Sequence, residues 1–323
     1  MLNPKETILL ARRKETVIPA FNIPYLPMVE PVAQAVKDEN SVAIIHVARV
    51  EWEKFSSRSL EAVAEEYRKF EKPGHTILGL DHVPVIDEDQ LRVDYLPIIR
   101  RAIEAGYQSV MIDGSRLALA ENIAATREVA DLVHKHGLAC EGELGAVMGH
   151  ESGPIKPYEE IFATKLGFTD TEEARRYVKE SRCDWISVAV GNIHGAVAEA
   201  TRHQKKPEAR LDIDHIAALY KATGIPLVLH GGSGIKLDYL KRGIKAGIAK
   251  INVGTEIRQA YEKGLEVAGS NTAVVSNNVN DSKTVSGSET AKVKQAQEKV
   301  YQRVRELIKD FEIANSRDLL FGR

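Results

Sequence analysis

The sequence is poor in cysteine, in net charge and in long apolar runs. Its two cysteines, Cys140 and Cys183, lie far apart among 323 residues, which argues against a disulfide framework. The formal net charge of -2 lacks the basic excess typical of proteins that bind nucleic acid or anionic membranes. No apolar run reaches transmembrane length, and the N-terminal run is too short for a signal peptide. We therefore expect a cytoplasmic protein with no nucleic-acid or membrane partner.

What the sequence does contain is a regular alternation of short apolar runs and longer helical patterns. Hydrophobic residues make up 43% of the chain, enough for a sizeable core. Helical patterns with apolar residues three and four positions apart separate the runs, and several end in glycine. The eight predicted strands span residues 17–23, 41–48, 76–82, 109–115, 139–145, 185–195, 226–232 and 250–256.

Eight such strands alternating with helices predict an α/β fold of the (β/α)8 TIM-barrel type over residues 1–265. A doubly wound open sheet is the alternative. Polar residues follow nearly all eight runs, always in the same direction along the chain, whereas an open sheet would gather them at one switch point. This distribution favours the barrel, with its active site at the C-terminal ends of the strands.

The C-terminal part of the chain differs in composition from the barrel. Residues 266–290 are mostly polar, and from 268 onward they are rich in Ser, Asn and Thr, which predicts an exposed mobile loop. Residues 291–323 follow as a predicted additional C-terminal helix and tail. We expect this helix to pack on the barrel or on a partner subunit.

Three histidines each follow an apolar run: His82, His194 and His230, from the third, sixth and seventh predicted strands. One histidine in such a place is more often structural than a ligand, but three at equivalent positions favour a shared role. Three neutral imidazoles that converge at a barrel mouth would make an open zinc (Zn2+) site, with a position left for substrate oxygen.

Acidic residues accompany these histidines. Asp81 precedes His82, and beside a divalent cation its carboxylate would make a credible proton shuttle to a substrate hydroxyl. Glu143 ends the fifth strand and could orient a ligand histidine or reach the metal. Glu151 lies in the Gly-flanked MGHESG, where a carboxylate could act as a base after loop closure.

A second group of small and hydroxyl residues follows the last strands. Glycines let backbone N–H groups approach an anion, Ser and Thr add donors, and a helix N-terminus attracts phosphate. Barrels often bind phosphate after strands seven and eight. The predicted phosphate-binding residues are Gly195, Gly231, Gly232, Ser233, Asn252 and Thr255.

Six motifs, in order, resemble the class II, zinc-dependent ketose-bisphosphate aldolases, to which fructose- and tagatose-bisphosphate aldolases belong. They are LDH (80–82), SVMIDGS (109–115), ELG (143–145), VAVGNIHG (188–195), LVLHGGSG (227–234) and INVGTE (251–256). AFNI (20–23) also resembles the first strand of that family. The likeness covers roughly residues 15 to 260, and the motifs together are far more specific than GGSG alone.

This resemblance implies a lyase of carbohydrate metabolism such as glycolysis, which splits a phosphorylated ketose between C3 and C4 and releases dihydroxyacetone phosphate. Fructose 1,6-bisphosphate is the first expected substrate. The three histidines would bind zinc, with Glu143 near the metal. Asp81 would exchange a proton with the C4 hydroxyl, and Glu151 would move the C3 proton. Asn252 would hold the enediolate, and the glycine and hydroxyl cluster the phosphate. We expect a homodimer or homotetramer.

The sequence departs from the family after the second strand. The usual serine is missing from HVARVEW, where Ala48 and Arg49 stand instead. The guanidinium of Arg49 could bind a carboxylate or a second phosphate at the far end of the substrate. One alternative is therefore the same reaction on a sugar-acid or deoxy-sugar phosphate. Another is a non-catalytic subunit of a partner aldolase, which the retained histidines, Asp81 and Asn252 disfavour.

A Schiff-base mechanism would need a lysine near the C-terminal end of a strand. Lys250 is expected at the start of the eighth strand, away from the mouth, and this placement disfavours that mechanism.

Overall fold

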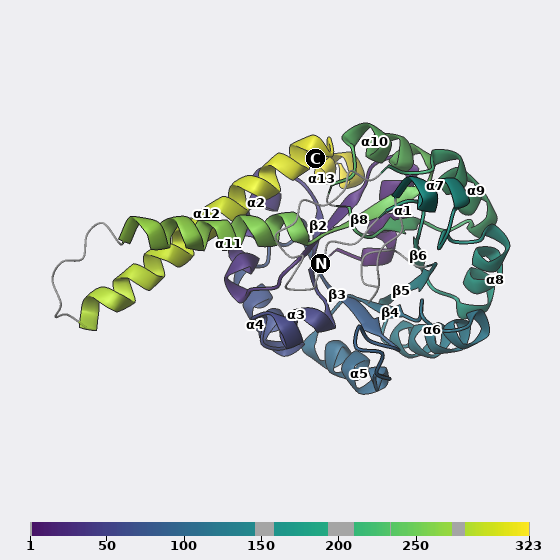
Figure 1. The fold of residues 1–323 in the computed structure, drawn as a ribbon, viewed down its shortest axis with the longest axis horizontal. Helices are drawn as coiled ribbons and strands as arrows, with labels where there is room; N and C mark the ends of the chain where they lie inside the picture. The colour runs from purple at the N-terminus through teal and green to yellow at the C-terminus, as the bar shows by residue number, and fades with distance from the viewer. Residues whose placement is uncertain (1, 146–157, 193–209, 233, 273–281, 323) are drawn as a thin grey trace.

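Eight parallel strands close into a barrel in which every strand pairs with its neighbours in sequence, and β1 pairs with β8 (Figure 1). The computed structural model describes residues 2–145, 158–192, 210–232, 234–272 and 282–322. The strands are β1 (Ile18–Asn22), β2 (Ala43–Val47), β3 (Thr76–Pro84), β4 (Ser109–Asp113), β5 (Ala139–Leu144), β6 (Trp185–Val188), β7 (Leu227–Leu229) and β8 (Ile248–Val253). The predicted (β/α)8 barrel is confirmed.

Helices surround the barrel (Figure 1). The described segments contain η1 (Leu26–Met28), α1 (Pro4–Arg13), α2 (Val29–Asp38), α3 (Arg49–Lys54), α4 (Leu60–Phe70), α5 (Tyr95–Ala105), α6 (Leu119–His134), α7 (Tyr158–Thr164), α8 (Thr171–Ser181), α9 (Ile213–Thr223), α10 (Leu237–Ala246), α11 (Thr255–Thr272), α12 (Ser282–Asp310) and α13 (Ser316–Phe321). In this part of the chain no helix is long and apolar enough to cross a bilayer.

The inside of the barrel changes from apolar to polar along the strands. Successive side chains of a strand point to opposite faces, so every second residue faces inward. In β1 the buried apolar residues Ile18 and Ala20 precede Asn22, and in β2 Ile44 precedes His46. Ile8 and Ala11 of α1 belong to the same apolar cluster as Ile18. Buried polar groups are thereby collected toward the C-terminal ends of the strands.

The structure corrects the predicted boundary of the eighth strand. The prediction began at Lys250, whereas β8 begins at Ile248, directly after Gly247, the residue that follows the end of α10. Gly247 has φ 151°, and a Cβ there would lie 2.7 Å from Tyr220, so this turn requires glycine. The motif KINVGTE therefore covers only the later part of the strand. Lys250 lies within β8 and not at its entrance.

The predicted loop over 266–290 is wrong at both of its ends. Helix α11 continues to Thr272 and α12 starts at Ser282, while residues 273–281 lie outside the described segments. The two helices pack against each other and extend beyond the barrel (Figure 1). A Cβ at Gly264 would lie 2.5 Å from the backbone of Ala296, so this close packing depends on glycine.

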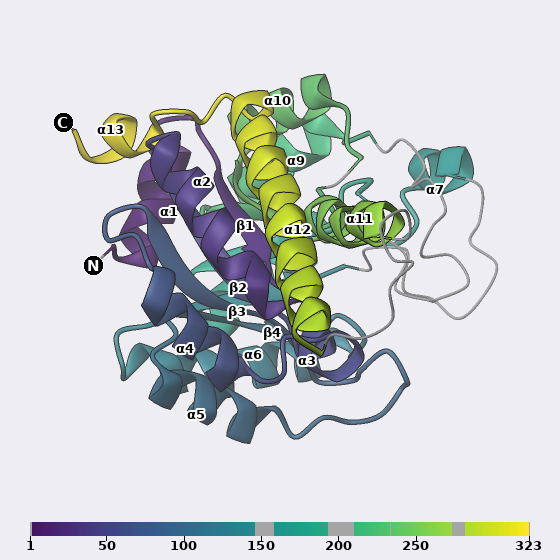
Figure 2. The same ribbon diagram turned by 90° about the vertical axis from the view of Figure 1, so that its left-hand side faces the viewer.

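Helix α12 begins at Ser282, before the predicted start of the C-terminal helix at residue 291, and packs on the barrel's outer layer beside α2 (Figure 2). Val300 and Val304 are completely buried. Tyr301 donates a hydrogen bond to Asp38, and Arg305 forms an ion pair with Glu39. The expected packing of this helix on the barrel is therefore present in the structure.

Candidate active site

Asp81 and His82 both reach the barrel interior because β3 is irregular there. The pairing of β3 with β4 shifts register between Leu80 and Val83, so the two residues between them do not follow the regular alternation. The strand itself continues to Pro84. Both side chains can therefore face the mouth because of an irregularity inside β3, since the strand continues beyond them.

His82 and His230 face each other across the barrel. Nε2 of His82 lies 2.7 Å from Nδ1 of His230. The other nitrogen of each ring contacts a carboxylate: His82 Nδ1 lies 3.2 Å from Asp113, and His230 Nε2 lies 2.7 Å from Glu141. Histidines that bind metal commonly use their second nitrogen in this way, which fixes the ring and its tautomer.

The charges around the two rings favour the binding of a cation. Burial alone lowers the pKa of His82, but the charge of Asp81 and the contact with Asp113 outweigh burial and raise it to about 10. Burial and the neighbouring His82 lower the pKa of His230. The surrounding carboxylates therefore stabilise positive charge at this point, and a divalent ion would supply it while both rings stay neutral. Ligand atoms of Asp81, His82 and His230 lie within 4.8 Å of one another.

Glu143 lies behind His82. Its Oε2 atom is 3.7 Å from His82 Nδ1 and has no hydrogen-bond partner among the described residues. Burial, together with Asp113, raises the pKa of Glu143 well above its usual value. Of the two predicted roles for this carboxyl group, orienting a ligand histidine fits its position, because it contacts the ring nitrogen that faces away from His230. A second group of possible metal ligands is formed by His82, Asp113 and Glu143.

Two amide side chains hold the carboxylate of Asp81. Asn22 Nδ2 donates to Oδ2 at 2.8 Å, and Asn252 Nδ2 donates to Oδ1 at 2.9 Å. Burial alone raises the pKa of Asp81, but the nearby histidines His82 and His46 more than offset burial and hold this pKa well below its ordinary value. Asp81 is therefore ionised and rigidly placed.

Lys250 is wrongly placed by the sequence analysis, since its ammonium group lies inside the barrel. It donates to Glu141 and to Asn252 Oδ1, both at 2.7 Å, and its side chain is fully buried. Glu141 also accepts from the indole of Trp185 at 2.6 Å. Burial raises the pKa of Glu141, but Lys250 and His230 more than offset it and lower it to about 2. Glu141 thus contacts both His230 and Lys250, and Lys250 in turn holds the amide oxygen of Asn252.

The segments that follow β7 and β8 lie side by side. The N–H of Gly232 donates to the carbonyl of Asn252 at 3.3 Å. Gly231 has φ 63°, and a Cβ at Gly232 would lie 2.6 Å from Ile251. Thr255 begins α11 immediately beyond β8. The arrangement brings glycine backbone next to a helix N-terminus, as the predicted phosphate site requires.

Arg49 is the first residue of α3, directly beyond β2. Its Nη1 lies 3.3 Å from Asp87, and its Nη2 lies 2.8 Å from Glu53. Asp87 is buried and accepts the backbone N–H groups of Asp89 and Leu91, whereas Glu53 is more than a third exposed. The guanidinium therefore has one fixed partner and one that can move.

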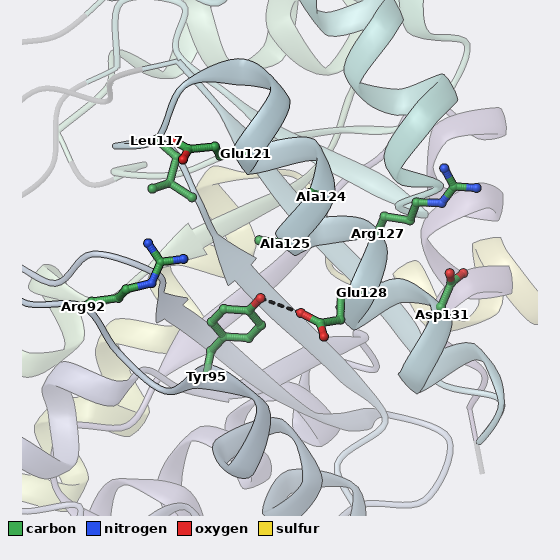
Figure 3. A pocket seen from close by; sticks show the side chains of 9 residues that line it. All are labelled: Arg92, Tyr95, Leu117, Glu121, Ala124, Ala125, Arg127, Glu128 and Asp131. Carbon is green, nitrogen blue, oxygen red and sulfur yellow. Dashed lines mark hydrogen bonds between the residues drawn. The ribbon is translucent and has the colours of Figure 1, made fainter.

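Four predicted site residues lie outside the described segments: Glu151, His194, Gly195 and Ser233. A groove of roughly 550 Å³ lies on the outer side of the barrel between α5 and α6, where Tyr95 donates to Glu128 at 2.6 Å (Figure 3). None of the residues that line this groove belongs to the histidine and aspartate cluster, so it is separate from the candidate active site.

Several buried or half-buried polar residues of the site were not assigned a role from the sequence: Asn22, His46, Glu51, Asp113, Glu141 and Lys250. The alternation of strands offered one signal. Glu141 and Glu143, like Lys250 and Asn252, are two positions apart and therefore share one face of their strand. Glu51 gave no such signal, because it lies on a short helix beyond β2.

Known proteins resemble this chain over most of its length. The profile of the class-II fructose-bisphosphate aldolase family matches residues 3–316. A 6-phospho-5-dehydro-2-deoxy-D-gluconate aldolase of Bacillus subtilis (strain 168) is 34% identical over 259 residues, 80% of each chain. A probable fructose-bisphosphate aldolase of the same strain is 31% identical, covering 82% of this chain and 85% of its own.

The crystal structure of the YdjI aldolase from Escherichia coli K12 superposes with a TM-score of 0.72 at 25% identity, over 97% of this chain and 98% of that one. The chain belongs to the class-II fructose-bisphosphate aldolase family and is an aldehyde-lyase.

Proposed function

We propose that this enzyme is a zinc-dependent aldolase that splits a phosphorylated ketose into dihydroxyacetone phosphate and an aldehyde. The observation that carries the proposal is the convergence of His82 and His230 beside the ionised Asp81, with a carboxylate behind each ring. His194 is the proposed third ligand. Bound zinc would act as a Lewis acid that withdraws electrons from the C2 carbonyl of the substrate.

The residues of the chain would carry the remaining steps. Asp81 accepts the proton of the C4 hydroxyl, the C3–C4 bond breaks as the aldehyde carbonyl forms, and the bonding electrons move into the enediolate. Asn252 orients toward the reacting centre because Lys250 holds its amide oxygen and leaves the amide N–H groups to face Asp81. Glu151 then returns a proton to C3, which gives dihydroxyacetone phosphate.

The phosphate of the dihydroxyacetone half would bind after β7 and β8. The hydrogen bond between Gly232 and Asn252 keeps the two segments together, and Thr255 adds a hydroxyl at the start of α11. Gly195, Gly231 and Ser233 complete the proposed cradle. This half of the site recognises the part of the substrate that all candidate ketose phosphates share.

We propose that the aldehyde product is a short aldehyde that carries a carboxylate, in preference to glyceraldehyde phosphate. A sugar-acid phosphate is therefore the first candidate substrate. Three relatives at 32–34% identity carry the name 6-phospho-5-dehydro-2-deoxy-D-gluconate aldolase. That compound has a ketone next to the phosphorylated carbon and a carboxylate at its far end. Aldol cleavage would release dihydroxyacetone phosphate and a three-carbon aldehyde acid.

Arg49 would bind the carboxylate of that aldehyde. Asp87 keeps the guanidinium in place, and the substrate carboxylate displaces the more exposed Glu53. A monoanionic carboxylate replaces Glu53 charge for charge, whereas a dianionic phosphate would add negative charge next to Asp87. Fructose 1,6-bisphosphate is the second candidate, because one relative at 31% identity is named a probable fructose-bisphosphate aldolase.

A substrate panel tests this order. The purified zinc-loaded enzyme is assayed for dihydroxyacetone phosphate released from 6-phospho-5-dehydro-2-deoxygluconate, fructose 1,6-bisphosphate and tagatose 1,6-bisphosphate. We expect the highest kcat/KM with the sugar acid. A higher value with either bisphosphate would reject the carboxylate assignment but keep the aldolase reaction. If no ketose phosphate releases dihydroxyacetone phosphate, the result would favour the alternative that this chain is a non-catalytic subunit of a partner aldolase.

A further inference from the structure

We propose that Glu51 is a positioning residue that fixes the carboxylate of Asp81 through the side chain of Asn22. The inference rests on the proposed role of Asp81 as the group that accepts the hydroxyl proton. It concerns a residue of α3 that lies outside the barrel strands and that neither the metal nor the phosphate site uses.

The carboxyl group of Glu51 is buried at the barrel mouth. The residue is 7% exposed, although it belongs to a six-residue helix next to the solvent-facing side chain of Glu53. Its Oε2 atom accepts the backbone N–H of Ala48 at 2.8 Å and lies 3.5 Å from Asn22 Nδ2. One oxygen of Glu51 thus faces both its own helix start and the end of β1.

Asn22 transmits this contact to Asp81. Its Nδ2 atom carries two hydrogens and is 2.8 Å from Asp81 Oδ2 and 3.5 Å from Glu51 Oε2. Because both neighbours are acceptors, the nitrogen and not the oxygen of the amide must face them. With Glu51 in place, rotation of the amide by half a turn would set its oxygen against two carboxyl groups. Glu51 therefore reinforces the orientation in which Asn22 donates to Asp81.

The protonation of Glu51 suits this role. Burial raises the pKa of Glu51 to about 8, opposed by the hydrogen bond from Ala48 and assisted by the charge of Asp81. At neutral pH Glu51 is therefore mostly uncharged, and its carbonyl oxygen still accepts both hydrogen bonds. The enzyme gains an acceptor for Asn22 without a second negative charge beside Asp81.

The opposite oxygen of Asp81 is fixed in a matching way. Asn252 donates to Oδ1, and the ammonium group of Lys250 holds the amide oxygen of Asn252. Each oxygen of Asp81 thus accepts from an amide, and each amide is oriented by an ionisable group behind it. Glu51 and Lys250 act from opposite ends: the first accepts from an amide nitrogen, and the second donates to an amide oxygen.

A simple capping role for Glu51 is the competing explanation, because its bond to Ala48 satisfies an N–H at the start of α3. Capping does not require contact with Asn22, so Glu51→Asp separates the two roles. Aspartate is one methylene shorter and can still cap the helix, but its carboxyl group cannot reach Ala48 and Asn22 together. Glu51→Gln keeps the length and an acceptor oxygen.

The experiment measures two reactions on the zinc-loaded enzyme: release of dihydroxyacetone phosphate from the best ketose phosphate, and exchange of the C3 proton of dihydroxyacetone phosphate with solvent. Exchange does not involve the hydroxyl group that Asp81 serves. We expect Glu51→Asp to lower kcat for cleavage about 10-fold or more while exchange changes less than about 2-fold. Glu51→Gln should stay within about 3-fold of the wild type in both. Lys54→Gln, on the same helix, should match the wild type.

A double-mutant cycle then asks whether the effect passes through Asn22. In an Asn22→Ala background, Glu51→Asp should change cleavage less than about 2-fold. Equal losses of cleavage and exchange, equal losses in both backgrounds, or full activity of Glu51→Asp would each overturn the inference. Asp81→Asn is assayed in parallel: if it keeps full activity, the proposed role of Asp81 fails and the inference with it. If only the Glu51 variants keep full activity, the inference alone fails.

Discussion

His82 Nε2 and His230 Nδ1 lie 2.7 Å apart at the centre of the barrel mouth, and each ring is held from behind by a carboxylate. Both rings are fixed and their nitrogens converge, and zinc–nitrogen bonds of about 2.0–2.1 Å would require only a small separation of the rings for both to bind one cation. The carboxylates compensate the charge that such a cation brings. This relationship is the basis of the first prediction.

Replacing His230 with Ala should remove metal and activity together. The enzyme is expected to hold stoichiometric zinc, and the variant loses one ligand and leaves Glu141 without its histidine partner. Zinc content by elemental analysis and release of dihydroxyacetone phosphate are measured on the same preparation. His136→Ala, at an exposed position, is the control and should keep both. Full zinc together with full turnover in His230→Ala would reject the assignment.

Asp81→Asn keeps the shape of the side chain but cannot accept a proton. We expect near-normal zinc content and a cleavage rate lower by roughly 100-fold or more, which is the usual scale for a lost general base. Steady-state kinetics with metal analysis check this. Unchanged turnover would mean that Asp81 serves only the hydrogen-bond network around Asn22 and Asn252.

Arg49→Ala should raise KM for the complete substrate and leave affinity for dihydroxyacetone phosphate nearly unchanged. The reason is that Arg49 lies beyond β2, whereas the proposed phosphate cradle follows β7 and β8. Inhibition by dihydroxyacetone phosphate gives the second affinity, and Lys54→Gln serves as a control of similar charge change. If both affinities fall equally, or neither changes, Arg49 forms only its ion pairs with Asp87 and Glu53.

Glu51 should make the stability of the enzyme depend on pH. Its carboxyl group keeps a proton up to a pKa of about 8 in the folded state but loses it near 4.5 when unfolded. Folding therefore takes up a proton between these values, and the stability of the wild type falls as pH rises through this range.

Relative to Glu51→Gln, which has no such proton, the wild type should lose roughly 2–4 kcal/mol between about pH 5 and about pH 9. The charges of Asp81 and His82 face Glu51 in both proteins, so the comparison isolates this one group. Denaturant unfolding at several pH values measures the difference. A stability difference that is constant with pH would show that Glu51 titrates normally.

The barrel and the centre of the site could be predicted because both leave local marks in the sequence. Eight apolar runs, nearly all followed by polar residues, predict eight strands with polar side chains at their C-terminal ends. His82 and His230 stand at such ends. Asp81 was predicted to share the mouth with His82, although the bulge that permits this depends on pairing with β4. Pairing of this kind is a tertiary property that one strand does not encode.

The supporting residues could not be predicted in the same way. Lys250 was misplaced because its strand was read from a motif and not from the turn at Gly247 that precedes it. Its partner Glu141 comes from a strand 109 positions earlier, so the ion pair exists only once the barrel closes. The ends of the polar segment 266–290 are helical because α11 and α12 pack against each other, which composition alone does not reveal.

The central claim is that a metal held by histidines, and not a lysine adduct, supports carbon–carbon cleavage in this enzyme. The most direct test is dihydroxyacetone phosphate release by the purified enzyme before chelation, after removal of metal, and after addition of zinc alone, with borohydride trapping in parallel. The account predicts that activity disappears with the metal, returns in proportion to bound zinc, and leaves no trapped adduct. Full turnover of the metal-free enzyme, with a ketose phosphate reduced onto Lys250, would contradict it.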